Sequence, residues 1–335
     1  MNTRSVIGLS LILAVSAALS AASVAGQWQA PRTADGHPDL QGNWNNSTIT
    51  PFQRAEGQEP VFSQAEVERL EGRAETSVTR GSQASDPNRP PLEVGGDVGS
   101  YNDVYFERGM RVAVVNGEPR ASILTRPLNG RRPPLTPAGQ QRLQDLRDFR
   151  SQFGDADHPE IRSLNDRCLM FGSNASVPMA PNGAYNNYYT IVQTADHVMI
   201  HVEVVHDTRV IPLRETAPPP AHVTQWGGYS WGRWEGETLV VETTNVYPVH
   251  AFRGIPPTED LKVTERFTRV ADDRIHYEFT VEDPATWDQP WSAEIPMMTT
   301  EGPMYEYACH EGNHDIRHIQ EVYRNIELQE AEETR

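Results

Sequence analysis

The second half of the chain carries a two-residue periodicity that is typical of β-strands. From His197 to Val205, every second residue is Val or Ile, so one face of an extended chain is apolar and the other polar. Similar stretches recur at short spacing, separated by turn residues such as Glu235-Gly236. The stretch 209–213 is expected to continue the strand 197–205 after a kink at His206-Asp207. We predict about eight strands, over 188–194, 197–205, 231–234, 238–244, 261–269, 274–281, 291–297 and 304–309.

Most connections between these strands are too short for crossover helices, so the strands are expected to run mostly antiparallel. Residues 313–329 follow them and place Ile316, Ile319, Tyr323 and Ile326 on one face of a helix. The pattern predicts a mainly β fold, an antiparallel barrel that is closed or nearly closed, with the C-terminal helix packed against its wall. We expect the apolar strand faces to point inward, because burial stabilises the fold by about 25 cal/mol per Å². In the alternative, polar faces point inward and line a cavity with His and Glu side chains.

Residues 26–184 are rich in Pro and Gly and predict an irregular region with short elements. Ser63 with Glu66 three residues later is a capping box, which predicts a helix over 63–80. Thr136 followed by Pro137 predicts a second helix that ends near Gln152. Short strands are expected at 39–44, 101–106, 110–115 and 121–125, and helical turns at 159–171. We treat this region and residues 185–330, the barrel with its helix, as one structural unit.

Residues 1–25 have the pattern of a secretory signal peptide. Arg4 ends a short basic segment, residues 6–18 are apolar, and Ser23-Val24-Ala25 fits a small-x-small cleavage site. A membrane anchor is the alternative, but the apolar run is shorter than the roughly 20 residues that a spanning helix needs. We therefore expect a periplasmic or secreted protein that is not inserted in a membrane after cleavage.

The acidic composition narrows the range of partners. Asp and Glu outnumber Lys and Arg by 46 to 29, which gives a formal net charge of −17. Because a nucleic-acid-binding surface requires a basic face, we expect a small-molecule or oligosaccharide ligand and no nucleic-acid partner.

The chain contains two cysteines, Cys168 and Cys309. In an oxidising compartment such a pair predicts one disulfide. This disulfide would close a long loop, for which the chain-entropy model gives on the order of 4–5 kcal/mol of stabilisation. The alternative is a thiolate nucleophile, which requires a free and partly exposed thiol.

Five motifs are spread over the chain: 38–42 (PDLQG), 185–187 (YNN), 206–213 (HDTRVIPL), 232–241 (GRWEGETLVV) and 305–313 (YEYACHEGN). Together they resemble those of a widespread family of uncharacterised exported bacterial proteins whose β-rich half is lipocalin-like. The resemblance implies a barrel fold and an exported location, and it implies no settled activity. Any function must therefore be argued from the residues themselves.

A cluster of ionisable residues surrounds the predicted kink. On one strand Glu203, Asp207 and Arg209 would share a face, and a bulge at the kink would bring His206 to the same side. A carboxylate from Asp207 or Glu203 can orient the imidazole as a general base or acid near neutral pH. Arg209 can hold a substrate carboxylate through two parallel hydrogen bonds. The alternative is a ladder of Arg and carboxylate side chains that faces solvent.

A second candidate pair, His310 and Glu311, lies in the segment 305–314. With His314 these residues match the zinc motif His-Glu-x-x-His, in which two His one helical turn apart bind the metal. However, Gly312 and Asn313 favour a helix cap over a helix interior, and the resembling proteins often carry an aromatic residue at the position of His314. We expect His310 and Glu311 to act without a metal beside the first cluster. Zinc bound by His310 and His314 is the alternative.

Aromatic residues gather in the second half of the chain, where they predict either a stacking platform for a sugar or aromatic ring, or the core and rim of the barrel. The tryptophans there are Trp226, Trp231, Trp234, Trp287 and Trp291. Trp234 falls within one of the shared motifs, and Tyr185 and Asn187 within another, so these three are candidate substrate-binding residues.

These observations give three hypotheses for the function. The first is an enzyme that acts on a small organic molecule or glycan fragment by acid–base chemistry, as a lyase, isomerase or hydrolase, with no cofactor. The second is a lipocalin-like binding protein whose apolar barrel cavity holds a hydrophobic ligand. The third is a zinc-dependent hydrolase that uses His310 and His314. The first hypothesis requires His206 and His310 to lie close together.

Overall fold

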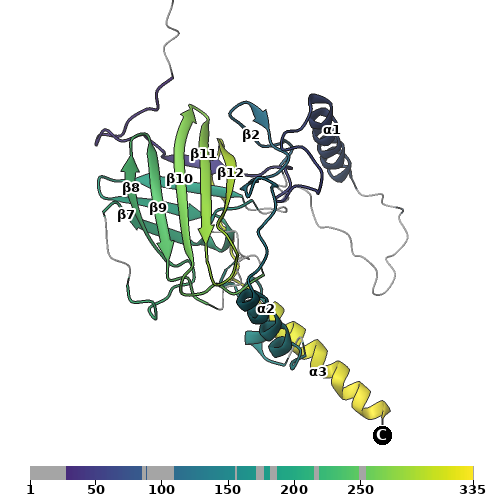
Figure 1. The fold of residues 1–335 in the computed structure, drawn as a ribbon. Helices are drawn as coiled ribbons and strands as arrows, with labels where there is room; N and C mark the ends of the chain where they lie inside the picture. Colours follow the sequence, from purple (N-terminus) through teal and green to yellow (C-terminus); the bar gives the residue numbers. More distant parts are fainter. Residues whose placement is uncertain are drawn as a thin grey trace, which may run out of the picture.

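Nine antiparallel strands form a nearly closed barrel, and helices lie outside it (Figure 1). The computed structural model describes residues 28–84, 88, 109–154, 157–170, 177–181, 187–214, 219–248 and 254–334. The predicted signal peptide, the predicted strand at 101–106 and Tyr185 lie outside these residues. The strands follow the order β7-β6-β5-β1-β12-β11-β10-β9-β8. Their bounds are β1 Gly42–Asn45, β5 Tyr188–Gln193, β6 His197–Val202, β7 Thr208–Pro212, β8 Tyr229–Glu235, β9 Thr238–Thr244, β10 Lys262–Ala271, β11 Arg274–Glu282 and β12 Trp291–Thr299.

The prediction of a mainly β fold with an antiparallel barrel and a C-terminal helix is confirmed. The strands β5 to β12 lie in the region where the alternating pattern predicted them. The remaining barrel strand, β1, comes from the N-terminal region and pairs with both β5 and β12. Trp44 in β1 is buried, and its indole nitrogen donates to the carbonyl oxygen of Leu40 at 2.9 Å. The irregular region therefore completes the barrel, and its short strand β4 (Leu124–Arg126) also pairs with β12. A separate two-stranded ribbon consists of β2 (Val114–Val115) and β3 (Glu118–Pro119).

The apolar strand faces point into the barrel, as expected. In β6 the side chains of Val198, Ile200 and Val202 are fully buried, while the residues between them are partly exposed. Trp287 and Trp291 belong to this core and pack edge to face at 5.7 Å, so these two tryptophans are core residues and form no ligand platform. The interior is filled with large side chains, which include Trp44, Tyr189, Tyr277, Phe267 and Phe279.

The barrel has one seam, between β7 and β8, the two ends of the strand order. No backbone pairing joins these strands within the part of the chain that the structure describes. Side chains close the gap instead. At Gly232 in β8, a Cβ atom would come within 3.2 Å of side-chain carbons of Ile211 and Leu213. Gly232 therefore allows the two edges to approach closely.

Capping residues start the first two helices where the sequence predicted them. Helix α1 (Gln64–Gly81) begins after Ser63, whose amide donates to Glu66 Oε2 at 2.8 Å within a complete capping box. Helix α2 (Pro137–Arg150) begins after Thr136, whose Oγ1 accepts from the amide of Gly139 at 3.0 Å. A short 3-10 helix at Pro159–Ile161 is the only helix assigned within the predicted turns at 159–171, of which residues 159–170 are described.

The C-terminal helix α3 (Asp315–Glu333) has the predicted position in the sequence, but not the predicted packing. It was expected against the barrel wall, and Figure 1 shows it extending away from the barrel toward the C-terminus. None of its described residues is fully buried, although Ile316, Ile319 and Gln320 near its start are half-buried. No helix in the described ranges combines the length and apolar character needed to cross a membrane.

Two predicted strand features are wrong. The chain does not kink at His206-Asp207 within one strand but reverses there, so that β7 pairs antiparallel with β6. Val205 and His206 both adopt left-handed backbone conformations, with φ of 56° and 44°, which turns the chain back. Residues 304–309 form no strand, because β1 and β11 already occupy both edges of the preceding strand β12.

Candidate functional site

A pocket of about 860 Å³ lies along the seam of the barrel. One wall comes from outward-facing residues of β7, and the other from β8 and the segment 219–228 that precedes it. Four aromatic side chains line it: Trp226, Tyr229, Trp231 and Tyr247. Polar groups are interspersed with them: Asp207, Thr208, Arg209, Thr224, Gln225 and Ser230. The pocket therefore combines flat apolar surfaces with hydrogen-bonding groups, as small-molecule sites do.

Backbone hydrogen bonds hold the aromatic wall in place. The amide of Gln225 donates to the carbonyl of Asn245 at 3.1 Å, and the amide of Tyr247 donates to the carbonyl of Gln225 at 2.7 Å. These bonds hold the ring of Tyr247 edge to face with that of Trp226, with centroids 4.7 Å apart. At Gly228, with φ of 72°, a Cβ would lie 2.5 Å from a backbone oxygen, so glycine is required there.

A buried ion pair forms the floor of the pocket. The guanidinium of Arg209 in β7 donates to both carboxylate oxygens of Glu265 in β10, with Nη1 to Oε1 at 3.1 Å. Its Nη2 also contacts Ser230 Oγ in β8 at 3.1 Å and Thr243 Oγ1 in β9 at 3.3 Å. The hydroxyl of Tyr277 in β11 donates to Glu265 Oε1 at 2.7 Å. Side chains of five strands are thus linked inside the barrel, across the seam.

Burial and the charge of Glu265 shift the pKa values of Arg209 and Tyr277 in this network. Burial lowers the pKa of Arg209, but the charge of Glu265 and the hydrogen bonds to it outweigh burial, so the pKa rises overall. Burial, followed by the adjacent charge of Glu265, raises the pKa of the Tyr277 hydroxyl well above its ordinary value. The network therefore holds a charged Arg209, and Tyr277 is a permanent donor.

Histidines meet at the β6–β7 reversal, next to the pocket. The rings of His206 and His310 lie with centroids 5.8 Å apart. Nδ1 of His206 lies 3.3 Å from the carbonyl oxygen of Tyr307, and because that oxygen only accepts, Nδ1 must be the donor. Nε2 of a neutral His206 is then the acceptor nitrogen. His201 in β6 contacts Thr208 Oγ1 through Nδ1 at 2.8 Å, and burial, followed by the charge of His206, lowers its pKa.

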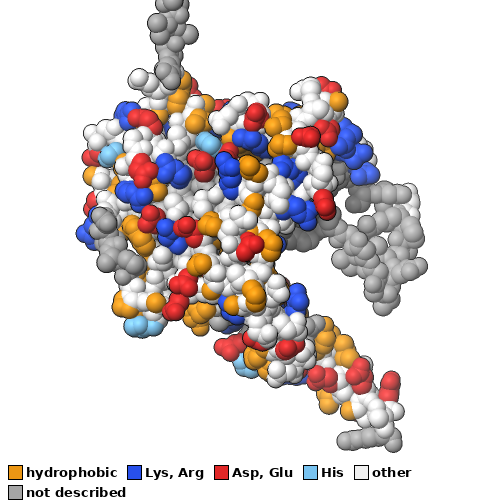
Figure 2. Space-filling model, in the orientation of Figure 1, with side chains coloured by type: hydrophobic (Ala, Val, Ile, Leu, Met, Phe, Trp, Pro, Cys, Tyr) orange, Lys and Arg blue, Asp and Glu red, His pale blue; other side chains and the backbone are white. Residues whose placement is uncertain are grey.

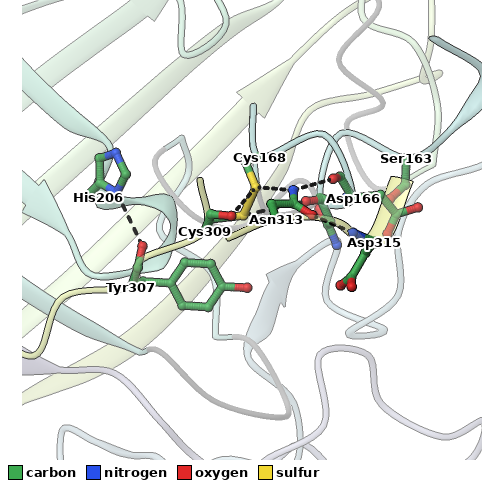
Figure 3. Close-up of a disulfide and its surroundings, with 9 residues drawn as sticks. Ser163, Asp166, Cys168, His206, Tyr307, Cys309, Asn313 and Asp315 are labelled. Atoms are coloured by element: carbon green, nitrogen blue, oxygen red, sulfur yellow. Dashed lines mark hydrogen bonds between the residues drawn. A yellow bond between two sulfur atoms is a disulfide. The ribbon is translucent and has the colours of Figure 1, made fainter. Parts of the chain in front are cut away.

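The disulfide fixes the segment that carries His310. Cys168 and Cys309 are bonded, as predicted, and no free cysteine remains in the described chain, which leaves no thiol for the nucleophile alternative (Figure 3). Nδ2 of Asn313 donates to the carbonyl of Asp166 at 3.2 Å, which adds a second link between the same two segments. Tyr307, whose carbonyl holds His206, is two residues from Cys309 (Figure 3). The disulfide thus acts as an anchor for one side of the histidine cluster.

The structure brings some of the predicted site residues together. His206, Asp207 and His310 meet at one end of the seam, with Asp207 lining the pocket. The prediction that His206 and His310 lie close together is confirmed. The tight reversal at Val205 and His206 achieves this, where the sequence had suggested a bulge.

The other predicted residues do not join this histidine cluster. Arg209 is neither a free substrate clamp nor part of a solvent ladder, because its guanidinium is buried against Glu265. Glu203 is buried beside a separate cavity of about 110 Å³. Asn187 is fully buried, and Trp234 stacks on His37 with centroids 4.9 Å apart. Glu311 lines another pocket, of about 650 Å³, beside the disulfide and α3.

The geometry does not support the zinc motif. Helix α3 begins at Asp315, so His310 and His314 do not lie one turn apart on a helix. The ring of His314 lies near that of His318, at 6.2 Å, and His310 lies near His206. Across the residues that the structure describes, no three His, Cys, Asp or Glu side chains form a group that could hold a metal ion.

Sequence reasoning missed His201, Tyr229, Gln225 and Tyr247 as members of the site. The dense aromatic run 226–231 (WGGYSW) was a usable signal for the pocket wall, and Trp226 and Trp231 do line it. Comparison of the chain with protein-family models gave no match, and comparison with curated proteins gave none either.

Proposed function

We propose that this chain is an exported enzyme that binds a neutral, hydroxylated ring compound, such as a glycan fragment, in the seam pocket. Acid–base chemistry by His206 and His310 then transforms the bound compound. The observation that carries the proposal is this histidine pair, which adjoins an aromatic-lined pocket through Asp207, the lining residue that follows His206 in the chain. The disulfide, together with the lack of a membrane-spanning helix in the described residues, fits an exported protein.

The charges of the pocket disfavour an anionic ligand. Two of its described lining residues are charged, Asp207 and Arg209. The charge of Arg209 is balanced inside the barrel by Glu265, so Asp207 dominates the potential at the surface of the pocket. The chain as a whole carries a formal charge of −17, which disfavours anionic ligands further.

The shape and chemistry of the walls favour a ring with hydroxyl groups. The indole rings of Trp226 and Trp231 offer flat faces for the C–H side of a sugar. The side-chain amide of Gln225 and the hydroxyls of Thr208 and Tyr229 can exchange hydrogen bonds with ligand hydroxyls. A long-chain hydrophobic ligand would leave these polar groups unpaired, which lowers its affinity.

The histidine pair supplies a base and an acid. Because Nδ1 of His206 is held by the Tyr307 carbonyl, Nε2 can accept a proton from the ligand. A protonated His310 can donate one to the departing or rearranging oxygen. A general base or acid of this kind accelerates a reaction by about 10²–10⁴-fold.

Binding and turnover can be tested separately. We expect neutral oligosaccharides to change the tryptophan fluorescence of the purified protein, and uronate-containing ones to do so more weakly. Trp226→Ala or Trp231→Ala should weaken binding by about 0.5–1.5 kcal/mol, or about 2- to 10-fold in Kd. The matched control is Trp28→Ala, because Trp28 is partly exposed and lies outside the pocket. Equal binding by Trp226→Ala and the native chain would contradict the proposed site.

For turnover, His206→Ala should lower kcat by about 10²–10⁴-fold and leave ligand binding intact. His197→Ala is the control, because His197 is paired with Asp196 and lies at the end of β6 that is away from the reversal. A protein that binds sugars without turning over any of them would support the second candidate, a binding protein. In such a binding protein the ligand would lie between the aromatic walls of the seam pocket, because large side chains fill the interior of the barrel.

A further inference from the structure

The seam pocket contains a carboxylate that the proposed chemistry does not use. Asp207 lines the pocket and is half-buried, and its Oδ1 accepts a hydrogen bond from the amide of Thr208 at 2.9 Å. Arg209, the next basic residue along β7, is buried and paired with Glu265. None of the ion pairs between described side chains includes Asp207, so its negative charge is available to a ligand.

The geometry of the seam places Asp207 close to the aromatic wall. Because the nine strands alternate in direction, the first and the last are parallel, and β7 and β8 run the same way along the seam. Arg209 contacts Ser230 at 3.1 Å, and a Cβ at Gly232 would lie 3.2 Å from Ile211. By the same spacing, Asp207 lies level with the turn that precedes β8.

This turn forms one side of an aromatic corner. The amide of Gly228 donates to the carbonyl of Gln225 at 3.1 Å, which closes the turn around Trp226. The rings of Trp226 and Tyr247 lie with centroids 4.7 Å apart and planes at 63°, and Tyr229 also lines the pocket. Because the faces of aromatic rings are electronegative, such rings attract a cation that lies within about 6 Å of their centroids.

Among the described residues, the basic side chains closest in sequence to this corner are already paired. Arg209 is the one Arg or Lys side chain among the described lining residues, and Glu265 balances its charge. Figure 2 shows basic and acidic side chains intermixed on the outer face of the barrel. There Arg233 in β8 is held by Glu235 at 2.9 Å and by Glu242 at 3.1 Å. The corner therefore has a net negative character.

An alkylated ammonium group suits this corner better than a metal ion does. A metal ion such as Ca²⁺ requires several oxygen ligands, whereas the described pocket lining supplies one carboxylate. The methyl groups of an alkylated ammonium can pack on aromatic faces while its charge stays near the carboxylate. The formal net charge of −17 also raises the local concentration of cations.

We infer that Asp207 and the rings of Trp226 and Tyr247 form a subsite for a small quaternary ammonium compound. This ligand class goes beyond the neutral ring compound proposed above, and its binding does not require the histidine pair. Since both ligands contact Trp226, they compete for the pocket.

Calorimetric titration of the purified, disulfide-bonded protein tests this inference. The probes are choline and its neutral isostere 3,3-dimethylbutan-1-ol, in which a carbon replaces the charged nitrogen. The titrations are made at constant ionic strength and about pH 8, where an ordinary imidazole is neutral. We expect choline to bind about 10-fold more tightly than the isostere. A native chain that binds both probes equally, or binds neither, overturns the inference.

Two substitutions and a control assign the subsite. Asp207→Asn keeps an acceptor for the Thr208 amide but removes the charge, and it should abolish the preference for choline over the isostere. Asp196→Asn removes the same charge where it is paired with His197, away from the reversal, and should retain the preference. Tyr247→Leu removes an exposed ring and should weaken choline binding about 2- to 5-fold, with unchanged circular dichroism. An Asp207→Asn variant that keeps the native preference overturns the inference.

The same titrations separate this subsite from the proposed enzyme. A chain that prefers choline but binds no neutral oligosaccharide supports the subsite and contradicts the proposed function. A chain that binds neutral oligosaccharides without any preference for choline does the reverse.

Discussion

Replacing Glu265 with Gln tests how the barrel is closed. In the native structure the Glu265 carboxylate is fully buried and accepts from the guanidinium of Arg209 and the hydroxyl of Tyr277. The substitution keeps the shape but leaves the positive charge of Arg209 buried without its counter-ion. Breaking one partner of a buried pair costs about 3–5 kcal/mol. Since whole domains are stable by about 5–15 kcal/mol, this loss is a large fraction of the total.

The assay is urea unfolding of the disulfide-intact protein, followed by tryptophan fluorescence and circular dichroism. We expect the midpoint to fall with an unchanged slope, and the melting temperature to drop by about 4–7 °C, from an unfolding entropy of about 2.1 cal/mol/K per residue. The matched control is Glu242→Gln, which breaks the exposed pair with Arg233 (3.1 Å) on the outer face of the barrel. That pair should contribute about 0–1 kcal/mol.

A double substitution separates the penalty of an unpaired charge from the net contribution of the pair. Arg209→Met with Glu265→Leu removes both charges, and the hydroxyls of Ser230 and Thr243 still bond to each other at 2.8 Å. We expect this variant to regain most of the stability lost in Glu265→Gln. A loss of less than about 1 kcal/mol in Glu265→Gln would contradict a buried ion pair, because the charge of Arg209 would then reach solvent through the seam.

The remaining predictions concern the disulfide, the acid limb and a helix cap. Changing both Cys168 and Cys309 to Ser should lower the free energy of unfolding by on the order of 4–5 kcal/mol in denaturant titrations, and an unchanged midpoint would contradict the anchoring role. The imidazole of His276, whose Nε2 lies 3.6 Å from Glu294 Oε2, is the main cause of a lowered pKa for Glu294. The contribution of this pair to stability is therefore present above the ordinary pKa of 4.5 and lost as pH falls through the lowered value. Glu294→Gln should therefore flatten the acid limb of stability against pH, and a limb as steep as the native one would refute the assignment. Ser63→Ala should speed amide exchange in the first turn of α1 through loss of about 1 kcal/mol of capping, without changing exchange in the barrel.

Local sequence signals predicted the elements of this fold well. The alternation at 197–205 predicted a strand with buried Val198, Ile200 and Val202, because a two-residue period can only sort side chains onto two faces. The capping signals at Ser63 and Thr136 fixed the starts of α1 and α2, because these caps satisfy backbone groups in their immediate neighbourhood. Such features depend on contacts within a few residues.

The residues of the site are brought together by contacts between distant parts of the chain, and no local sequence pattern predicts such contacts. Arg209 and Glu265 are 56 residues apart and meet because the sheet curls until β7 approaches β8 to β10. The reversal at Val205 and His206 was read as a kink, since two non-glycine residues in left-handed conformations have no sequence signature. The predicted packing of α3 was wrong for a related reason. An apolar stripe predicts that a helix face is covered, but it does not say which surface covers it.

The seam explains why the unusual features of this barrel occur together. A closed barrel removes its sheet edges, whereas here β7 and β8 end the strand order without pairing in the described structure. The buried ion pair lies where these two strands meet, and Gly232 in β8 permits their close approach. The strained turn at Val205 and His206 leads directly into β7. Strained backbone and buried charge persist where the surrounding structure enforces them, and they concentrate at functional sites. Their coincidence along one line of the barrel, beside an aromatic-lined pocket, is why we assign function to the seam and not to the filled interior.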